Sequence, residues 1–334
     1  MNAARITIGF AATVIAAALH LAAAPAFAQA GAWKPEKNVE IIVGLTAGSS
    51  QDRGARAIQS IAQAKALLGV NMTVVNRVGG GGNIAWNYLA THSGDAHFVQ
   101  IASPTILTNY IIGTTQHTHT EFTPLALLGN QYIGFAVRPD SPLKTLRDLA
   151  DRLRADPASV SIGLNSLGSY LHMMCALSAR SLGVDPKKLK LVIFQGAELM
   201  TAGLGGHVDA IATVSSNLLP HVQSGKLRML GISAPRRLGG ALAQTPTLKE
   251  QGVDVVLANW QGVFGPPKLG QAQVAYWDTV FGRIVKTDEW RRDQEQNLWE
   301  SEYLNSADYA RFLKTDYEQA KAIFIELGLA RKDF

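Results

Sequence analysis

The chain has 334 residues, of which 47% are hydrophobic and 17% charged, the composition of an ordinary globular protein. Its length exceeds what one hydrophobic core comfortably serves and predicts two domains. The formal charge of +5 at pH 7 comes without a dense Lys/Arg cluster, so no nucleic-acid partner is expected, while an anionic small ligand is compatible.

The first 28 residues have the pattern of a cleaved export signal. Arg5 provides the positive start, residues 6–24 form an Ala-rich apolar run, and Ala26, Phe27 and Ala28 fit a small-residue cleavage site. A membrane anchor is the alternative, which the small-residue site disfavours. We therefore expect cleavage after Ala28 and a mature protein in a bacterial periplasm. The mature chain has no other apolar run near the ~20 residues that a membrane span needs.

Residues 39–56 carry the most informative pattern. Val39 to Val43 is typical of a buried parallel strand, a small polar loop follows, and a helix is predicted from near Asp52 to Leu68. This geometry directs unpaired backbone N–H groups and a helix dipole at one point, which suits an anion. The loop lacks P-loop and dinucleotide motifs, so a carboxylate is as acceptable as a phosphate. The alternative is an ordinary α/β turn that binds nothing.

Two further loops follow strands in the N-terminal part. A strand at 71–75 leads to a glycine-rich loop and a helix at 83–90, and a strand at 97–102 leads to Ser103 and Thr105. Ligands of open α/β sheets lie beyond such strand ends. His117 and His119 could suggest a metal, but without a nearby acidic or Cys partner a solvated loop is the expectation, and no metal site is predicted.

The strand and helix alternation then restarts. Strands are predicted at 132–137, 160–163, 189–194, 208–214, 227–232 and near 260–265, with helices at 143–154 and 170–182 and two more at the C-terminus, the second capped at Ser306. The single cysteine, Cys175, lies in an apolar helical pattern and is predicted to be a buried, inert thiol. Two α/β units with Ser- and Gly-bearing loops would face one another across a cleft, as in a hinged binding protein.

No catalytic arrangement survives inspection. The glycine before Ser166 is one residue too far for a Gly-x-Ser-x-Gly elbow. His172 is expected to pack under its loop or reach the ligand, and Asp52 to cap N–H groups or orient the first loop. The alternative is a secreted α/β serine hydrolase with Ser166 or Ser169 as nucleophile, which would need a His and an acid within hydrogen-bond reach and would show turnover. No catalytic residue and no cofactor is predicted.

Several dispersed motifs resemble the substrate-binding receptors of tripartite tricarboxylate transporters, the Bug-type receptors. They lie at residues 47–56, 76–83, 122–126, 137–142, 205–209, 224–228 and 246–252, in order over nearly all of the mature chain. The resemblance implies a type II-like periplasmic binding protein of two α/β domains, each a mainly parallel sheet flanked by helices, with the ligand cleft between them. Domain one would comprise 29–131 plus 259–334, and domain two 132–258.

The resemblance also implies the ligand and its contacts. Family ligands are mostly small carboxylates, held by loop amides, hydroxyls and bridging waters rather than by an Arg clamp. The matching positions are Gly48, Ser49, Ser50, Gln51, Asp52, Ser103, Thr105, Ser166, Gly168, Ser169, Gly196 and Ala197. Bulky replacements at Ser50 or Asp52 are expected to abolish ligand-induced thermal stabilisation without unfolding the free protein.

The sequence departs from the family pattern in the first loop. Gly-Leu-Thr at 44–46 replaces the usual Pro-Phe-Pro, Ser49 replaces a Gly, and Gln51 replaces a Thr, adding an amide that could contact the ligand. The ligand therefore need not be a simple dicarboxylate. The implied partners are integral-membrane transporter subunits, with a sensor-only role as the alternative, and a monomer is expected.

Overall fold

In the computed structural model, which describes residues 33–194 and 196–334, ten strands form one mixed sheet in the order β2-β1-β3-β9-β4-β7-β5-β6, with β10 and β8 also pairing with β4. The predicted signal peptide and Gln195 lie outside the described residues. The strands are β1 (Val39–Val43), β2 (Met72–Asn76), β3 (Phe98–Ala102), β4 (Thr123–Val137), β5 (Ser161–Leu164), β6 (Lys190–Ile193), β7 (Ala210–Val214), β8 (Arg228–Ile232), β9 (Ala258–Gly265) and β10 (Leu304–Asn305).

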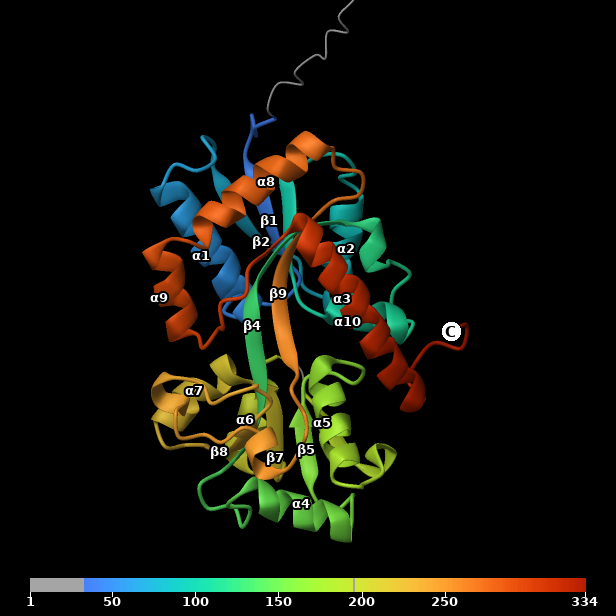
Figure 1. Cartoon of the computed structure of the whole chain (residues 1–334). Coiled ribbons are helices and arrows are strands. Elements are labelled where there is room, and N and C mark those ends of the chain that lie inside the picture. Colours follow the sequence, from blue (N-terminus) through green and yellow to red (C-terminus); the bar gives the residue numbers. More distant parts are fainter. Residues whose placement is uncertain (1–32, 195) are drawn as a thin grey trace, which may run out of the picture. The chain divides into compact units, whose positions relative to one another are not determined.

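Helices alternate with these strands (Figure 1). They are α1 (Ser50–Ala64), α2 (Asn83–Ala90), α3 (Thr105–Ile111), α4 (Leu146–Ala155), α5 (Tyr170–Ser181), α6 (Glu198–Gly205), α7 (Ser215–Gln223), α8 (Gln271–Ile284), α9 (Asp288–Gln296) and α10 (Ser306–Glu326). None of the helices in the described part of the chain has both the length and the apolar character needed to cross a membrane.

The long strand β4 divides the sheet into two halves. In the first half, β1 pairs in parallel with β2 and β3, and β9 runs antiparallel to β3 and to residues 123–132 of β4. In the second half, β5 pairs in parallel with β6 and β7, while residues 133–137 of β4 lie between β7 and β8. The strand ends that precede α1 and α3 therefore belong to the first half, and those that precede α5, α6 and α7 belong to the second.

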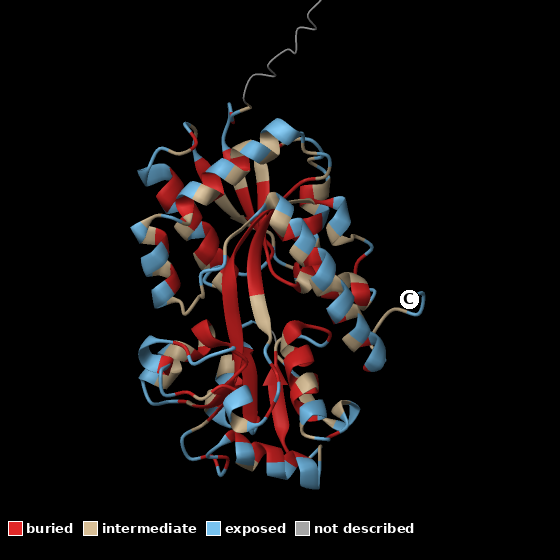
Figure 2. Ribbon diagram, in the orientation of Figure 1, coloured by how far each residue is buried: buried red, intermediate tan, exposed pale blue. Residues whose placement is uncertain are grey.

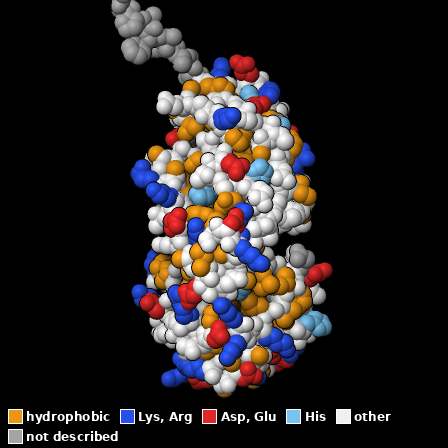
Figure 3. All heavy atoms as spheres, turned by 90° about the vertical axis from the view of Figure 1, so that its right-hand side faces the viewer, with side chains coloured by type: hydrophobic (Ala, Val, Ile, Leu, Met, Phe, Trp, Pro, Cys, Tyr) orange, Lys and Arg blue, Asp and Glu red, His pale blue; other side chains and the backbone are white. Residues whose placement is uncertain are grey.

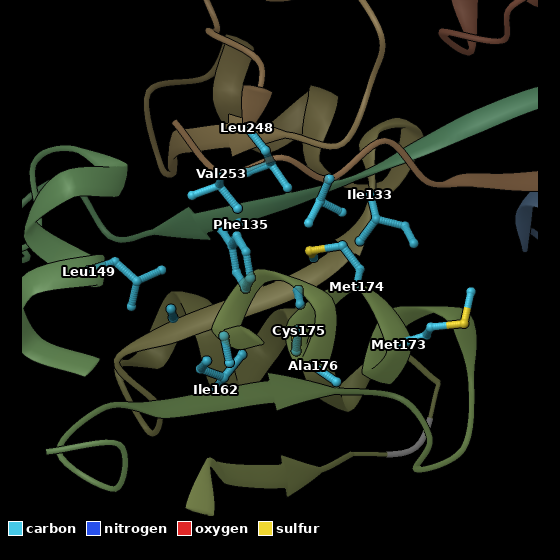
Figure 4. Close-up of a cluster of buried hydrophobic side chains, with 14 of the residues drawn as sticks. Ile133, Phe135, Leu149, Ile162, Met173, Met174, Cys175, Ala176, Leu248 and Val253 are labelled. Carbon is cyan, nitrogen blue, oxygen red and sulfur yellow. The ribbon is translucent and has the colours of Figure 1, made fainter. Parts of the chain in front are cut away.

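Each half has its own buried core, and the inner strands are buried along most of their length (Figure 2). The first core includes Ile42, Trp86 and Phe264. The second includes Phe135 and Ile162, which face side chains of α5 and of the segment at 248–253 (Figure 4). Burying these apolar strand and helix residues stabilises both the sheet and its helical cover.

Helix α10 contributes to both cores. Tyr309 and Leu313, near its start, belong to the first core, whereas Ala320 and Phe324, near its end, belong to the second. The described chain from Lys34 onward forms one compact unit. The division at residues 131/132 and 258/259 stays a prediction, and α10 shows that side chains from 259–334 pack into the core formed mainly by 132–258.

Several predicted elements were placed correctly, but five predictions need correction. Strand β4 begins at Thr123 rather than 132, and α4 begins at Leu146 rather than 143, because Thr145 and Asp148 form a capping box. Helix α1 ends at Ala64. The cap of α10 is Asn305, whose side chain accepts from the backbone of Asp308. Helices α3 and α9 were missed, so three helices rather than two follow β9.

Candidate ligand-binding site

The first loop, between β1 and α1, is fixed by Asp52. Its carboxylate accepts hydrogen bonds from Gly48 N at 2.9 Å, from Arg56 Nε at 2.9 Å and from Asn76 Nδ2 at 3.0 Å. Ser49 caps the helix, since its hydroxyl accepts from the backbone N–H of Asp52. Gly48 has φ +79°, a left-handed conformation that glycine adopts without strain. The expectation that Asp52 orients the loop is confirmed.

The charge of Asp52 is internally compensated. Burial by itself would raise the pKa of Asp52, but the hydrogen bonds from Arg56, Gly48 and Asn76 outweigh it and hold that pKa below its usual value. The carboxylate is therefore ionised and paired with Arg56 on both oxygens. An anion approaching the loop would meet the N-terminus of α1 rather than an unpaired negative charge.

The loops after β1 and β3 are joined by side chains. Gln51 Nε2 donates to Ser103 Oγ at 2.9 Å, and Ser103 Oγ lies 3.2 Å from Thr105 Oγ1. Gln51 and Ser103 are both buried. The Gln51 amide nitrogen, expected to be available to the ligand, is thus already bonded within the protein. The structure brings the first loop together with Ser103 and Thr105, as the strand-end argument predicted.

The loop between β5 and α5 has a similar construction. The Ser169 hydroxyl donates to the Ser166 carbonyl at 2.7 Å and caps α5 by accepting from the backbone of His172. Gly168, at φ +66°, donates its N–H to His172 Nδ1 at 3.1 Å. Burial lowers the pKa of His172 to about 4, so the ring is neutral and can accept this bond. His172 therefore packs under the loop, one of the two roles expected for it.

The loop after β6 joins this second group. Asn165 Nδ2 donates to the carbonyls of Phe194 and Gly196, each at 3.2 Å. Gly196 has φ +48°, and Ala197 is the N-cap residue of α6. Asn165 thus links the Ser166–Ser169 loop to the loop that contains Gly196 and Ala197.

Two contacts connect the halves of the sheet close to these loops. A Cβ added to Gly168 would lie 2.7 Å from Ile112 Cδ1, so the α5 loop touches the residue that follows α3. On α1, Arg53 Nη2 lies 3.4 Å from Ser216 Oγ at the start of α7. That one ligand bridges the two groups of loops stays a prediction.

Sequence reasoning did not select four polar residues that contact these loops or directly follow a strand. They are Arg53, Ser215, Ser216 and Gln261. Ser215 and Ser216 directly follow β7, so the strand-end rule that selected the other loops applies to them as well. Gln261, on β9, donates from Nε2 to the Ser50 carbonyl at 3.4 Å, and Gly54 leaves the room for its amide. The contact between Arg53 and Ser216 spans 163 positions and has no local sequence signal.

Other candidate chemistry has ordinary explanations. His117 Nδ1 lies 2.7 Å from Glu121 Oε2, so the prediction that His117 has no acidic neighbour was wrong. The ring of His119 lies against the ring of Tyr317. Among residues 33–194 and 196–334, no three His, Cys, Asp or Glu side chains are grouped to hold a metal. Cys175 is a free, buried thiol, as predicted, and burial raises its pKa to about 12.

The surface offers two further observations. Acidic and basic side chains are interspersed over the face shown in Figure 3. An open depression of about 330 Å³ lies at the C-terminal end of α5, lined by Leu177, Arg180, Ser181, Asp254, Val255 and Val256. This depression is at the opposite end of α5 from Ser169 and does not belong to the predicted site.

Comparison with known proteins agrees with this architecture. A family model described as tripartite tricarboxylate transporter family receptor matches residues 55–329. A UPF0065 protein in the gbd 5' region of Cupriavidus necator is 29% identical over 317 residues, covering 94% of each chain. An R. palustris protein solved with adipate has a TM-score of 0.79 and 24% identity, covering 89% of this chain and 99% of that one. MatC from Rhodopseudomonas palustris with bound malate has a TM-score of 0.73 and 22% identity, with 86% and 99% covered.

The fold is the α/β fold of the periplasmic binding protein BugD, and in this chain β4 and β9 run between two sheet halves. The chain belongs to the family of tripartite tricarboxylate transporter receptors, because the family model covers most of its length. The resemblance drawn from the motifs is thereby confirmed. Family members are solute-binding receptors and not enzymes, which removes the serine hydrolase alternative. In addition, the Ser169 hydroxyl is engaged in capping α5.

Proposed function

We propose that this receptor captures a small organic anion, a carboxylate, between the first loop and the α5 loop, and presents it to the membrane subunits of a tripartite tricarboxylate transporter. The observation that carries the proposal is the matched construction of the two loops. Each loop precedes a helix, contains a glycine at positive φ and ends in a serine that caps the helix. In the first loop the charge of Asp52 is paired with Arg56, and in the α5 loop the ring of His172 is neutral.

The expected binding energy is sufficient for a receptor. Hydrogen bonds to a charged group contribute about 1.5–3 kcal/mol each, and micromolar affinity corresponds to about 8 kcal/mol. Three or four such bonds from loop amides and hydroxyls would therefore hold a carboxylate. The solved relatives with malate and adipate support this ligand class.

A ligand screen with one loop variant tests the proposal. Native mass spectrometry would identify a co-purified ligand, and thermal-shift measurements would compare mono-, di-, tri- and aromatic carboxylates. Ser50→Leu, at the half-buried first residue of α1, is expected to abolish the ligand-induced shift while leaving the melting temperature of the free protein unchanged. Ser60→Leu, at an exposed position of the same helix, is the matched control.

An unchanged ligand shift in Ser50→Leu would remove the first loop as a contact. Asp52 is not a clean position for the same test, contrary to the expectation from sequence. It is 2% exposed and holds Gly48, Arg56 and Asn76 at once, so a bulky side chain there would destabilise the free protein as well.

A further inference from the structure

Arg53 lies between the two halves at the start of two helices. Its Nη1 donates to the Gly48 carbonyl of the first loop at 2.7 Å, and its Nη2 lies 3.4 Å from Ser216 Oγ in the first turn of α7. The side chain is half-buried. A guanidinium has five N–H donors in a fixed plane, so these two contacts leave it the capacity to donate to a further acceptor.

Two buried donors lie close to the start of α7. Ser215 is fully buried, and its hydroxyl has no hydrogen-bond partner among the described residues. Gln131 is 1% exposed, and its Nε2 is likewise unpartnered within that part of the chain. In the β4–β7 ladder Ile133 pairs with Val214. Ser215 directly follows Val214, and Gln131 lies two residues before Ile133, so both residues are at the same end of this ladder.

The contact of Arg53 with Ser216 places its guanidinium at the start of α7, and the ladder places the backbones of Ser215 and Gln131 at that end of β7. Buried polar groups are normally hydrogen-bonded, so unpaired ones near an arginine favour binding of an acceptor. The carboxylates that act on Arg53 are Asp52, which is already paired with Arg56, and Asp293 of α9. Burial raises the pKa of Asp293, which disfavours its charged form. The start of α7 is thus rich in donors and carries the charge of Arg53.

We propose that Arg53 is a specificity-determining residue that, with Ser215, Ser216 and Gln131, binds a second acceptor group of the ligand. This inference rests on the proposed function and deepens it. The first loop and the α5 loop hold one carboxylate, and the Arg53 set selects ligands with another acceptor. Acids of equal chain length would therefore be distinguished by the group at their second end.

Titration calorimetry with paired acids tests the inference. The probes are succinate against butyrate and adipate against hexanoate, each pair matched in chain length. The wild type is expected to prefer the diacid, and Arg53→Gln is expected to lose about 10- to 100-fold in diacid affinity with little change for the monoacid. Arg53→Lys should retain part of the preference because it keeps the charge but not the planar donor pair. Ser216→Ala should lower the preference for the diacid by a smaller factor than Arg53→Gln does.

Lys65→Gln is the matched control, since it removes one positive charge just beyond the end of the same helix, where Lys65 pairs with Glu289. If Arg53→Gln weakens both members of a pair equally, Arg53 only holds Gly48 in place and the inference is overturned, while the proposed function stands. A wild type that prefers the monoacids also overturns it. If the wild type binds no carboxylate, the proposed function itself fails, together with this inference.

Discussion

At the scale of single residues, His172 determines how the α5 loop is held. Its neutral ring accepts the N–H of Gly168 at 3.1 Å, and its side chain is 6% exposed. An imidazolium could not accept this bond, because both ring nitrogens would then carry protons. Protonating His172 therefore means breaking a buried contact of the loop that begins α5.

This contact gives stability a defined pH dependence. The pKa of His172 is about 4 in the folded protein and about 6.5 when unfolded, so the folded state binds the proton less readily. The contribution of neutral His172 to the free energy of unfolding is fully present above about pH 6.5. It is lost as the pH falls towards about 4, and the loss reaches about 3 kcal/mol. His172→Gln should flatten the urea-unfolding profile over this range, whereas His207→Gln, at an exposed position, should not. Parallel profiles for wild type and His172→Gln would contradict the assignment.

Single residues also show what could be read from the sequence alone. Asp52 and His172 follow strand-end loops at helix starts, and the sequence predicted that Asp52 orients its loop and that His172 packs under its loop or reaches the ligand. The partners of Gln51 and Arg53 lie 52 and 163 positions away. Such contacts depend on the assembled sheet, so local patterns do not contain them. For the same reason the bond between Gln51 and Ser103 was not predicted, and the contact of the Gln51 amide with the ligand stays a prediction.

At the scale of elements, the α5 loop and the end of α3 fit together at Gly168. The residue has φ +66°, and an added Cβ would meet Ile112. Gly168→Ala should destabilise the protein by about 1–2 kcal/mol from the left-handed backbone alone, with a further loss from the clash. In the Ile112→Ala background the clash part should disappear, which thermal unfolding of the four proteins would measure. Additive effects of the two substitutions would show that the loop and α3 are not in contact.

Elements with strong apolar patterns were predictable, and those without them were not. Branched residues marked β1, and residues 83–90 were placed at the bounds of α2. Helix α9 has only Trp290 and Gln294 buried among nine mostly charged residues, so no apolar face marks it. The first part of β4 contains Pro124 and a register shift, which conceal the strand pattern.

At the scale of the whole molecule, the half-buried carboxyl of Asp316 interacts with elements of both halves. Asp316 of α10 accepts from Trp260 Nε1 on β9 at 2.6 Å. Burial raises the pKa of Tyr170, the first residue of α5, and the nearby charge of Asp316 raises it further. Burial raises the pKa of Asp316 itself, despite the hydrogen bond from Trp260. One ionisable group thus interacts with β9, which lies between the halves, and with the helix that follows the Ser166–Ser169 loop.

The sign of this shift predicts a stabilising substitution. Because the folded pKa of Asp316 is above its unfolded value, its favourable contribution is complete at low pH and is lost as the pH rises through the folded pKa. Asp316→Asn keeps an acceptor for Trp260 but cannot ionise. We expect it to raise the melting temperature at neutral pH and to reduce the decline between acid and neutral pH. A lower melting temperature at neutral pH would mean that the charge itself stabilises the fold.

The sequence predicted the α/β class and the repeated strand-loop-helix pattern, because both follow from local periodicity and turn residues. It did not predict that α10 reaches from one core to the other. Ala320 and Phe324 lie on the apolar stripe of α10, but an apolar stripe does not say which core it enters. The participation of one helix in two cores is a property of the tertiary arrangement.

We infer that helix α10 would limit any opening of this receptor between the two halves. With Tyr309 fixed in one core and Phe324 in the other, it acts as a rigid strut beside the two crossing strands. In a hinge motion, displacement increases with distance from the hinge. The side of the molecule formed by α5 and α10 should therefore move little when the halves separate. Solute would then enter past α1 and α7, where Arg53 meets Ser216 and would be among the first groups it encounters.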